Sequence, residues 1–102
     1  MTLNSKQVMV ARVYLTEASD TLDDVLDYLK KEAKLRGYRV FRAIRGMGDS
    51  GEHASRLVDV SLNLPVIVEF FDEREKMKPI IQHLSEWVKP GHILFWEAHV
   101  NT

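Results

Sequence analysis

The chain has no cysteine among its 102 residues, so disulfide bonds and thiolate chemistry are excluded. It also lacks an excess of charge, because 14 lysines and arginines stand against 15 aspartates and glutamates, a net charge of −1. Proteins that bind nucleic acid usually carry a basic excess, so no nucleic-acid partner is expected. No apolar run approaches the length of a membrane span, and residues 1–7 hold no hydrophobic signal core. We therefore expect a cytoplasmic protein that does not insert into a membrane.

Apolar periodicity divides the chain into strands and helices within one expected domain, residues 1–102. Period-two and continuous apolar patterns predict main strands at residues 8–15, 38–45, 66–71 and 92–100, and a further short strand at 57–64. Apolar residues three and four apart predict two helices, with buried faces at residues 22–33 and 77–88. The main elements follow the order strand, helix, strand, strand, helix, strand.

This order is that of the ferredoxin-like βαββαβ arrangement, an α+β fold. Two right-handed crossovers place both helices on one face of an antiparallel sheet. The other face is then bare in a single copy, where Trp96 or, on the opposite side of the last strand, Phe95 would be exposed. Bare apolar sheet faces usually mark association, so we expect copies of the chain to assemble sheet on sheet.

Residues at the helix ends predict where each helix starts and stops. The N-cap of the first helix is expected at residue 20 or 21, and Gly37 is the natural residue to follow its C-terminus. Pro79 leaves two possible starts for the second helix, because a proline inside a helix costs about 3 kcal/mol or more. Either a helix capped by Asp72 has a distorted first turn, or the regular helix starts near Lys78.

A glycine-rich stretch after the second strand carries the candidate functional residues. Glycines stand at positions 46, 48 and 51, and four cationic residues flank them, two on either side: Arg42, Arg45, His53 and Arg56. Glycine lets a ligand approach the backbone closely, and cationic side chains beside exposed backbone N–H groups suit an anion such as phosphate. A hairpin loop with ordinary surface arginines is the plainer interpretation of the same residues.

The motifs of this stretch resemble those of nitrogen-regulatory PII proteins. Arg45-Gly46-Met47-Gly48 resembles the Lys-Gly-Phe-Gly turn that ends their second strand, and Leu64-Pro65 resembles the Leu-Pro pair before their third strand. The chain is more similar still to an uncharacterised PII-like family of bacteria and archaea, a domain of unknown function related to PII and CutA proteins. That pattern continues here through His53 and Ser55-Arg56 to the valines after Pro65, so the resemblance spans residues 8–100.

Some positions depart from these family patterns. Ala43 stands where the family has glycine, and Met47 stands where it has an aromatic residue. Met47 is a soft apolar replacement, which we expect to keep the packing. Gly91 belongs to a reduced version of the PII phosphate loop, from which the basic side chain after the glycines is missing. His92 is the only candidate to replace that side chain.

The resemblance implies a regulatory protein without enzymatic activity, a homotrimer that binds a small anionic ligand in clefts between subunits. An adenine nucleotide is one candidate for this ligand, and a carboxylate metabolite and an ion are others; the resemblance implies no other cofactor. The implied ligand contacts come from the glycine stretch and from the loop before the last strand: Arg42, Arg45, Gly46, Met47, Gly48, His53, Arg56, Gly91 and His92. Binding would order the loop at residues 47–55, which would then act on a protein partner such as a transporter or an enzyme.

Two other classes of function stay open. The ferredoxin-like fold also hosts small α+β-barrel enzymes, which would need a pocket with buried polar groups between the sheet and the helices. Catalysis has little support, since the chain has no cysteine and no Gly-x-Ser-x-Gly motif. A CutA-like metal site would need histidines to converge across subunits, but the four histidines are scattered, so no metal site is expected.

Overall fold

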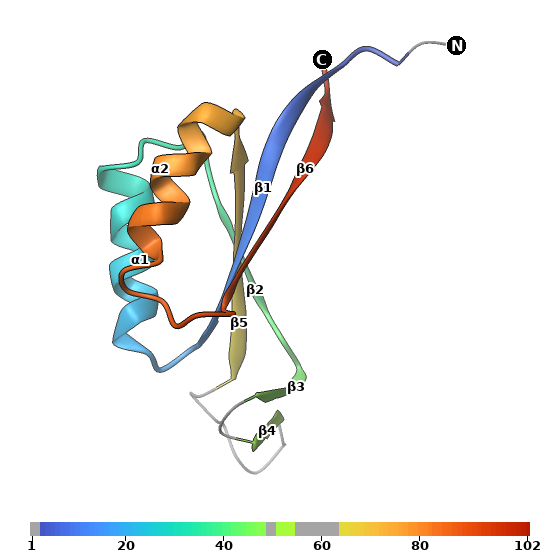
Figure 1. Ribbon diagram of the computed structural model, residues 1–102. Helices are drawn as coiled ribbons and strands as arrows, with labels where there is room; N and C mark the ends of the chain where they lie inside the picture. The colour runs from blue at the N-terminus through green and yellow to red at the C-terminus, as the bar shows by residue number, and fades with distance from the viewer. Residues whose placement is uncertain (1–2, 49–50, 55–63) are drawn as a thin grey trace.

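A computed structural model describes residues 3–48, 51–54 and 64–102. Within these residues the elements are β1 (Ser5–Thr16), α1 (Asp20–Lys31), β2 (Arg39–Arg42), β3 (Arg45–Gly48), β4 (Gly51–Ala54), β5 (Pro65–Asp72), α2 (Arg74–Leu84) and β6 (Ile93–Asn101). Four strands build one antiparallel sheet in the order β2-β5-β1-β6, and Figure 1 shows both helices on the same face of it. The predicted ferredoxin-like α+β fold is confirmed.

The central strand β1 is paired along both of its edges. Ala11 lies opposite Phe70 of β5 on one side and opposite Phe95 of β6 on the other. Met9, Ala11 and Val13 alternate along the strand, face the helices and are buried. The alternate residues point to the other face, where Val8, Val10 and Tyr14 add apolar surface around Arg12, which suits a strand in the middle of a sheet.

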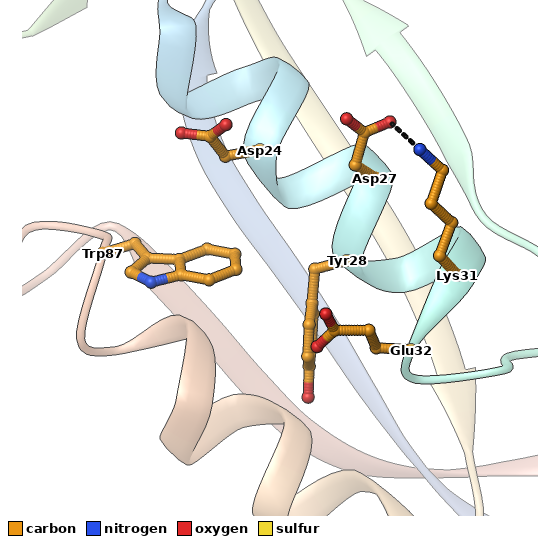
Figure 2. A pocket seen from close by; sticks show the side chains of 6 residues that line it. All are labelled: Asp24, Asp27, Tyr28, Lys31, Glu32 and Trp87. Carbon is orange, nitrogen blue, oxygen red and sulfur yellow. Dashed lines mark ion pairs between the residues drawn. The ribbon is translucent and has the colours of Figure 1, made fainter.

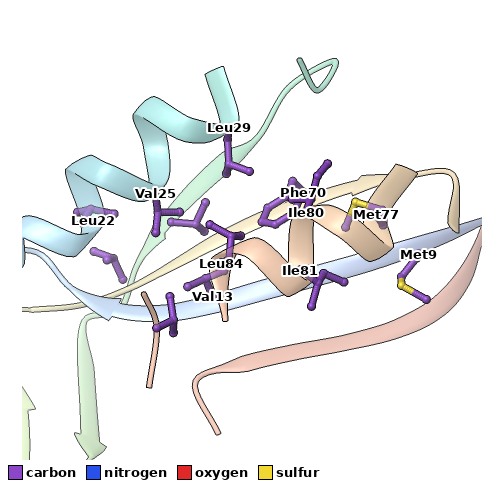
Figure 3. Packing of buried hydrophobic residues seen from close by; sticks show 14 residues of the cluster. Met9, Val13, Leu22, Val25, Leu29, Phe70, Met77, Ile80, Ile81 and Leu84 are labelled. Carbon is purple, nitrogen blue, oxygen red and sulfur yellow. The ribbon is translucent and has the colours of Figure 1, made fainter. Parts of the chain in front are cut away.

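The core lies between the sheet and the two helices, and Figure 3 shows its packing. Its buried members are Met9, Ala11, Val13, Val66, Val68 and Phe70 from the sheet, Leu22, Val25, Leu29, Met77, Ile80, Ile81 and Leu84 from the helices, and Val88 beyond α2. The helix faces predicted from the apolar spacing are therefore the buried ones. Full burial of one such large side chain contributes roughly 1.5–3 kcal/mol, so the sheet holds both helices in place. In the described part of the chain, no helix is long and apolar enough to cross a bilayer.

The glycine-rich stretch forms a hairpin, and the second strand ends earlier than predicted. β2 stops at Arg42, and β3 then pairs with β4, with Gly46 opposite His53. The Ala43 N–H still donates to the carbonyl oxygen of Pro65 at 2.8 Å. Because β5 begins at Pro65, it offers β2 no further partner, and this ends the strand. The strand predicted at 57–64 lies outside the described residues except for Leu64, which is buried.

The ends of α1 differ from the prediction by a few residues. The N-cap is Ser19, whose side-chain oxygen accepts a hydrogen bond from the Thr21 N–H at 3.1 Å. Serine, aspartate and threonine all favour this position, so the sequence alone could not separate them. The left-handed residue after the helix is Lys34, with φ +52°, and not Gly37. The carbonyl oxygen of Lys34 accepts from Nζ of Lys76 at 2.9 Å, which ties this turn to α2.

Asp72 anchors the start of α2 from just outside the helix. Its Oδ1 accepts from the N–H of Glu73 at 2.7 Å, and its Oδ2 lies 3.2 Å from Nζ of Lys76. Burial raises the pKa of Asp72, but the bonds from Glu73 and Lys76 outweigh that effect, so its pKa is lowered. The N-cap residue itself is Glu73, whose side chain makes no capping bond.

Pro79 lies inside α2, because the helix begins at Arg74. The alternative of a helix starting near Lys78 is therefore wrong. Proline has no N–H to donate to the carbonyl of Glu75, four residues earlier, so the helix carries a local defect that its buried face must offset.

Replacing Pro79 with alanine is expected to raise the free energy of unfolding by about 2–2.6 kcal/mol. Alanine is about 3 kcal/mol better than proline inside a helix, and the unfolded chain gains back about 0.4–1 kcal/mol of conformational freedom. Urea denaturation at one protein concentration measures the change. Gln82→Ala, at an exposed position of the same helix, is the control and should stay within about 0.5 kcal/mol of the wild type. A Pro79→Ala variant less stable than the wild type would contradict the expectation.

Candidate functional site

The described candidate ligand residues lie at one end of the sheet, which we call the loop end. It is formed by residues 16–17, 42–48, 64–65 and 90–93. β1 and β2 finish at this end, whereas β5 and β6 start there, as the pairs Thr16 with Pro65 and Arg42 with Val66 show. The β3–β4 hairpin projects from the same end in Figure 1.

Backbone hydrogen bonds outside the regular ladders join neighbouring strands at the loop end. The N–H of Glu17 donates to the carbonyl oxygen of Leu64 at 2.8 Å, and the N–H of Tyr14 donates to that of His92 at 2.8 Å. Together with the bond from Ala43 to Pro65, they fix where each loop leaves the sheet. The loop end is therefore a frame on which the candidate residues are held.

Arg42 forms an ion pair within the chain. Its Nη2 lies 3.0 Å from Oε2 of Glu17, and the two side chains are 52% and 31% exposed. Glu17 was not singled out from the sequence, because nothing in the polar residues after the first strand shows that they will lie beside Arg42. An anion that uses Arg42 has to compete with this carboxylate.

Gly46 lies close to Pro65, the first residue of β5. A Cβ atom at position 46 would lie 3.0 Å from Cγ of Pro65, which is tighter than ordinary van der Waals contact. Met47, the next residue, is 83% exposed, so the expectation that it keeps the packing is not met within one copy of the chain. Ile44 is exposed to a similar degree, at 84%. These two apolar side chains have no cover in a single copy.

The second wall of the predicted cleft begins just before β6. Gly91 has φ +83°, a conformation that favours glycine. The N–H of His92 donates to the carbonyl oxygen of Lys89 at 3.1 Å, and its Nδ1 lies 3.2 Å from the carbonyl oxygen of Pro90. This tight turn holds the His92 backbone against β1.

The two predicted walls lie on opposite edges of the sheet. Arg45 and Gly46 follow the edge strand β2, whereas Gly91 and His92 precede the other edge strand, β6. Two strands separate these edges, so the walls are roughly 14 Å apart by the usual spacing between strands. One copy of the chain therefore brings Arg42, Arg45 and Gly46 together but does not bring them to His92.

The remaining candidate residues are less fully described. His53 lies in β4 with its backbone opposite Gly46, and Gly48 lies opposite Gly51. Arg56 lies outside the described residues. In residues 3–48, 51–54 and 64–102, no three histidine, aspartate or glutamate side chains are arranged to hold a metal ion.

The face of the sheet away from the helices, which we call the open face, carries apolar and aromatic side chains. Strand pairing places on it the apolar and aromatic side chains Val10, Tyr14, Phe41, Ile67, Phe71, Leu94 and Trp96, and the charged side chains Arg12, Arg39 and Glu69. Leu94 is 52% exposed and Trp96 is 39% exposed, while Phe95, on the helix side of β6, is 52% exposed. The expectation of an exposed aromatic residue on this strand holds on both of its sides.

Charged side chains interrupt the apolar open face, and Arg12 and Glu69 form an ion pair there. Nε of Arg12 lies 2.7 Å from Oε1 of Glu69, and the Arg12 guanidinium carbon lies 5.9 Å from the centre of the Trp96 ring. The hydrogen bond to Glu69 raises the pKa of Arg12. Both charges keep a partner if the open face becomes covered, which lowers the cost of covering it.

The chain matches known proteins over almost its whole length. The family model DUF190, described as "Uncharacterized ACR, COG1993", matches residues 8–100. One UPF0166 protein of Aquifex aeolicus is 42% identical over 56 residues, 53% of that relative's length. A second comparison with a UPF0166 protein of the same organism gives 32% identity over 98 residues, 93% of this chain and 97% of the relative.

A solved structure shares the fold. It is that of CPII bound to ADP and bicarbonate, from Thiomonas intermedia K12, and it superposes with a TM-score of 0.75. The likeness covers 99% of this chain and 95% of the CPII chain, at 15% identity. CPII is described as a nitrogen regulatory PII-like protein, so the fold is PII-like.

Two glycine substitutions should separate close packing at the hairpin from general glycine effects. Gly37→Ala meets nothing within 4 Å, so it should raise the free energy of unfolding by about 0.4–1 kcal/mol through the unfolded chain. Gly46→Ala should instead be less stable than Gly37→Ala by about 1–2 kcal/mol, because its Cβ crowds Pro65. Urea denaturation of both variants measures the difference. Equal stability of the two variants would show that Gly46 is not required for close approach.

Proposed function

Because the chain belongs to the DUF190 family and has the PII-like fold, we propose that it is a non-enzymatic PII-like regulator. In this proposal the chain forms a homo-oligomer, a trimer, and binds a small anionic ligand in clefts between subunits. The ligand is an adenine nucleotide, and the 47–55 loop, which contains parts of β3 and β4, acts on a protein partner. The family resemblance expected from the sequence motifs is itself confirmed by the match over residues 8–100.

The observation that carries the proposal is the position of the two walls. Arg45 and Gly46 lie at one edge of the sheet, and Gly91 and His92 lie at the other edge, at the same end. Edges that cannot meet within one copy can meet between neighbours whose sheets pack together. A cleft closed by one edge of each neighbour would use all four residues.

The chemistry of the first wall suits an anion. Arg42 and Arg45 are both exposed and stand on either side of the point where β2 ends. Guanidinium groups bind phosphate in a fork of two parallel hydrogen bonds. The ion pair between Arg42 and Glu17 means that the ligand replaces a carboxylate, which favours ligands with strongly charged groups. CPII, of the same fold, is described as bound to ADP and bicarbonate, which supports an anionic ligand of this kind.

A binding function is better supported than catalysis, because of the side chains in the layer between the sheet and the helices. Among the described residues, no polar or charged side chain is buried there or elsewhere. A small α+β-barrel enzyme would need such groups facing an internal pocket. A regulator needs no reacting group at the loop end, because its bound ligand acts by changing which conformation of the protein is stabilised.

The open face should hold the oligomer together, and two variants on β6 can test this. Leu94 and Phe95 are equally exposed, at 52%, but point to opposite faces of the sheet. Leu94→Lys places a second cation directly opposite Arg12 on the open face, so it should shift the assembly toward monomer by at least tenfold in dissociation constant. Phe95→Lys, the matched control, should leave the assembly intact. Sedimentation velocity at micromolar concentration measures both, and a monomeric wild type would contradict the assembly.

A ligand in the cleft should raise the melting temperature in a way that depends on Arg45. We would test nucleotides, cyclic nucleotides, phosphate and bicarbonate on the wild type. A ligand at about 100 times its dissociation constant adds about 2.7 kcal/mol of stability, which gives a clear shift. Arg45→Ala should abolish the shift, whereas Lys30→Ala, which removes an exposed cation of α1, should keep it. No shift with any of these anions would count against the ligand part of the proposal.

A further inference from the structure

A second candidate binding site lies on the helix side of the molecule, across the sheet from the open face. A cavity of about 350 Å³ lies there, and Figure 2 shows the side chains that line it. Its lining comes from α1 and the segment after it, and from the residues that follow α2: Asp24, Asp27, Tyr28, Lys31, Glu32 and Trp87. We call this cavity the helix groove. An assembly through the open face would leave the groove accessible.

Aromatic rings form one side of the helix groove and hold one another in place. The rings of Tyr28 and His83 stack with centres 4.3 Å apart and planes at 19°. Trp87 meets both edge-on, with centres 5.5 Å from Tyr28 and 4.7 Å from His83. Trp87 is nevertheless 41% exposed, and Figure 2 shows its ring beside the open space below Asp24. The groove therefore has an aromatic surface that is fixed before any ligand arrives.

Carboxylates dominate the charge around these rings. The lining holds three acidic side chains and one lysine, a formal charge of −3 + 1 = −2. The lysine is already used, because Nζ of Lys31 lies 3.9 Å from Oδ1 of Asp27. In the part of the chain that the structure describes, Asp24 and Glu32 make no side-chain hydrogen bond or ion pair. Burial, and then the negative charge of Glu32, raise the pKa of Tyr28, so its ring stays neutral at neutral pH.

The aromatic rings and the carboxylates of the helix groove together favour one class of ligand. The negative face of an aromatic ring attracts a cation, and Trp is the strongest of the aromatic side chains in this respect. Two carboxylates without a cationic partner add charge complementarity. Metal ions do not fit, since aromatic rings are not their ligands and no metal-binding group occurs among the described residues. The cavity volume falls in the range of small-molecule sites.

We propose that the helix groove binds the alkylammonium or guanidinium group of a small organic amine. The cation lies against the ring of Trp87, with Asp24 as its counter-charge, and Glu32, eight residues further along the chain and so roughly 12 Å away, adds negative potential. The aliphatic part of such an amine covers the remaining exposed area of Trp87 and Tyr28. This site is separate from the anion site at the loop end and does not depend on it.

Fluorescence titration tests the proposal directly. Trp96→Phe leaves Trp87 as the only tryptophan, and 1,4-diaminobutane, agmatine and tetramethylammonium serve as probes. We expect a saturable change in Trp87 emission at millimolar probe, with no such change for sodium chloride at the same ionic strength. In this background Asp24→Asn should weaken binding about two- to fivefold, the size expected for one exposed charge contact. Asp24→Asn combined with Glu32→Gln should weaken it further.

The matched control is Asp20→Asn, which removes an exposed charge from the same helix outside the groove. It should bind the probes as the unsubstituted background does, and so should Arg45→Ala, which leaves the groove intact. The ring signals of Tyr28 and His83 in an NMR titration give a second readout that does not rely on tryptophan emission. A linear, non-saturating response, or equal loss in Asp24→Asn and Asp20→Asn, would overturn the proposal.

Discussion

The double-sided pairing of β1 is the constraint on which the rest of the structure depends. Ala11 lies between Phe70 of β5 and Phe95 of β6, so β1 and β5 fill the middle of the sheet. β2 and β6 are thereby forced to opposite edges, and the loops next to them open at the same end. The separation of the two candidate walls follows from this arrangement. In the proposed function, a single copy is therefore an incomplete site, and assembly and ligand binding belong together.

The two faces of the sheet have different tasks. The helix side closes the core, and its buried residues match the apolar spacing along each helix. On the open face Phe41, Phe71, Leu94 and Trp96 stay partly exposed, and Arg12 and Glu69 keep each other as partners if that face is covered. The helix groove lies on the far side of the helices, so cations there and anions at the loop end would meet separate surfaces of one molecule.

Much of the fold could be predicted because it rests on periodicity within short segments. The spacing of Val25 and Leu29 predicts a buried helix face, and the alternation of Val66, Val68 and Phe70 predicts a buried strand face. The candidate site was located by glycines and arginines, yet the Glu17–Arg42 pair was missed because it joins residues 25 positions apart. The stacking of Tyr28 on His83 was missed for the same reason, because the sequence around each residue does not indicate a partner in another helix. Pro79 within α2 shows tertiary burial outweighing a local preference.

Subunit mixing is the measurement that tests the central claim, a ligand cleft shared between copies. Arg45→Glu spoils the first wall and His92→Asp spoils the second, so neither homo-oligomer should bind the nucleotide that stabilises the wild type. In a random mixture, about a quarter of the clefts should combine an intact Arg45 from one copy with an intact His92 from its neighbour. Recovery of binding to about that level is the predicted result. Mixed oligomers that bind no better than either variant alone would contradict a shared cleft.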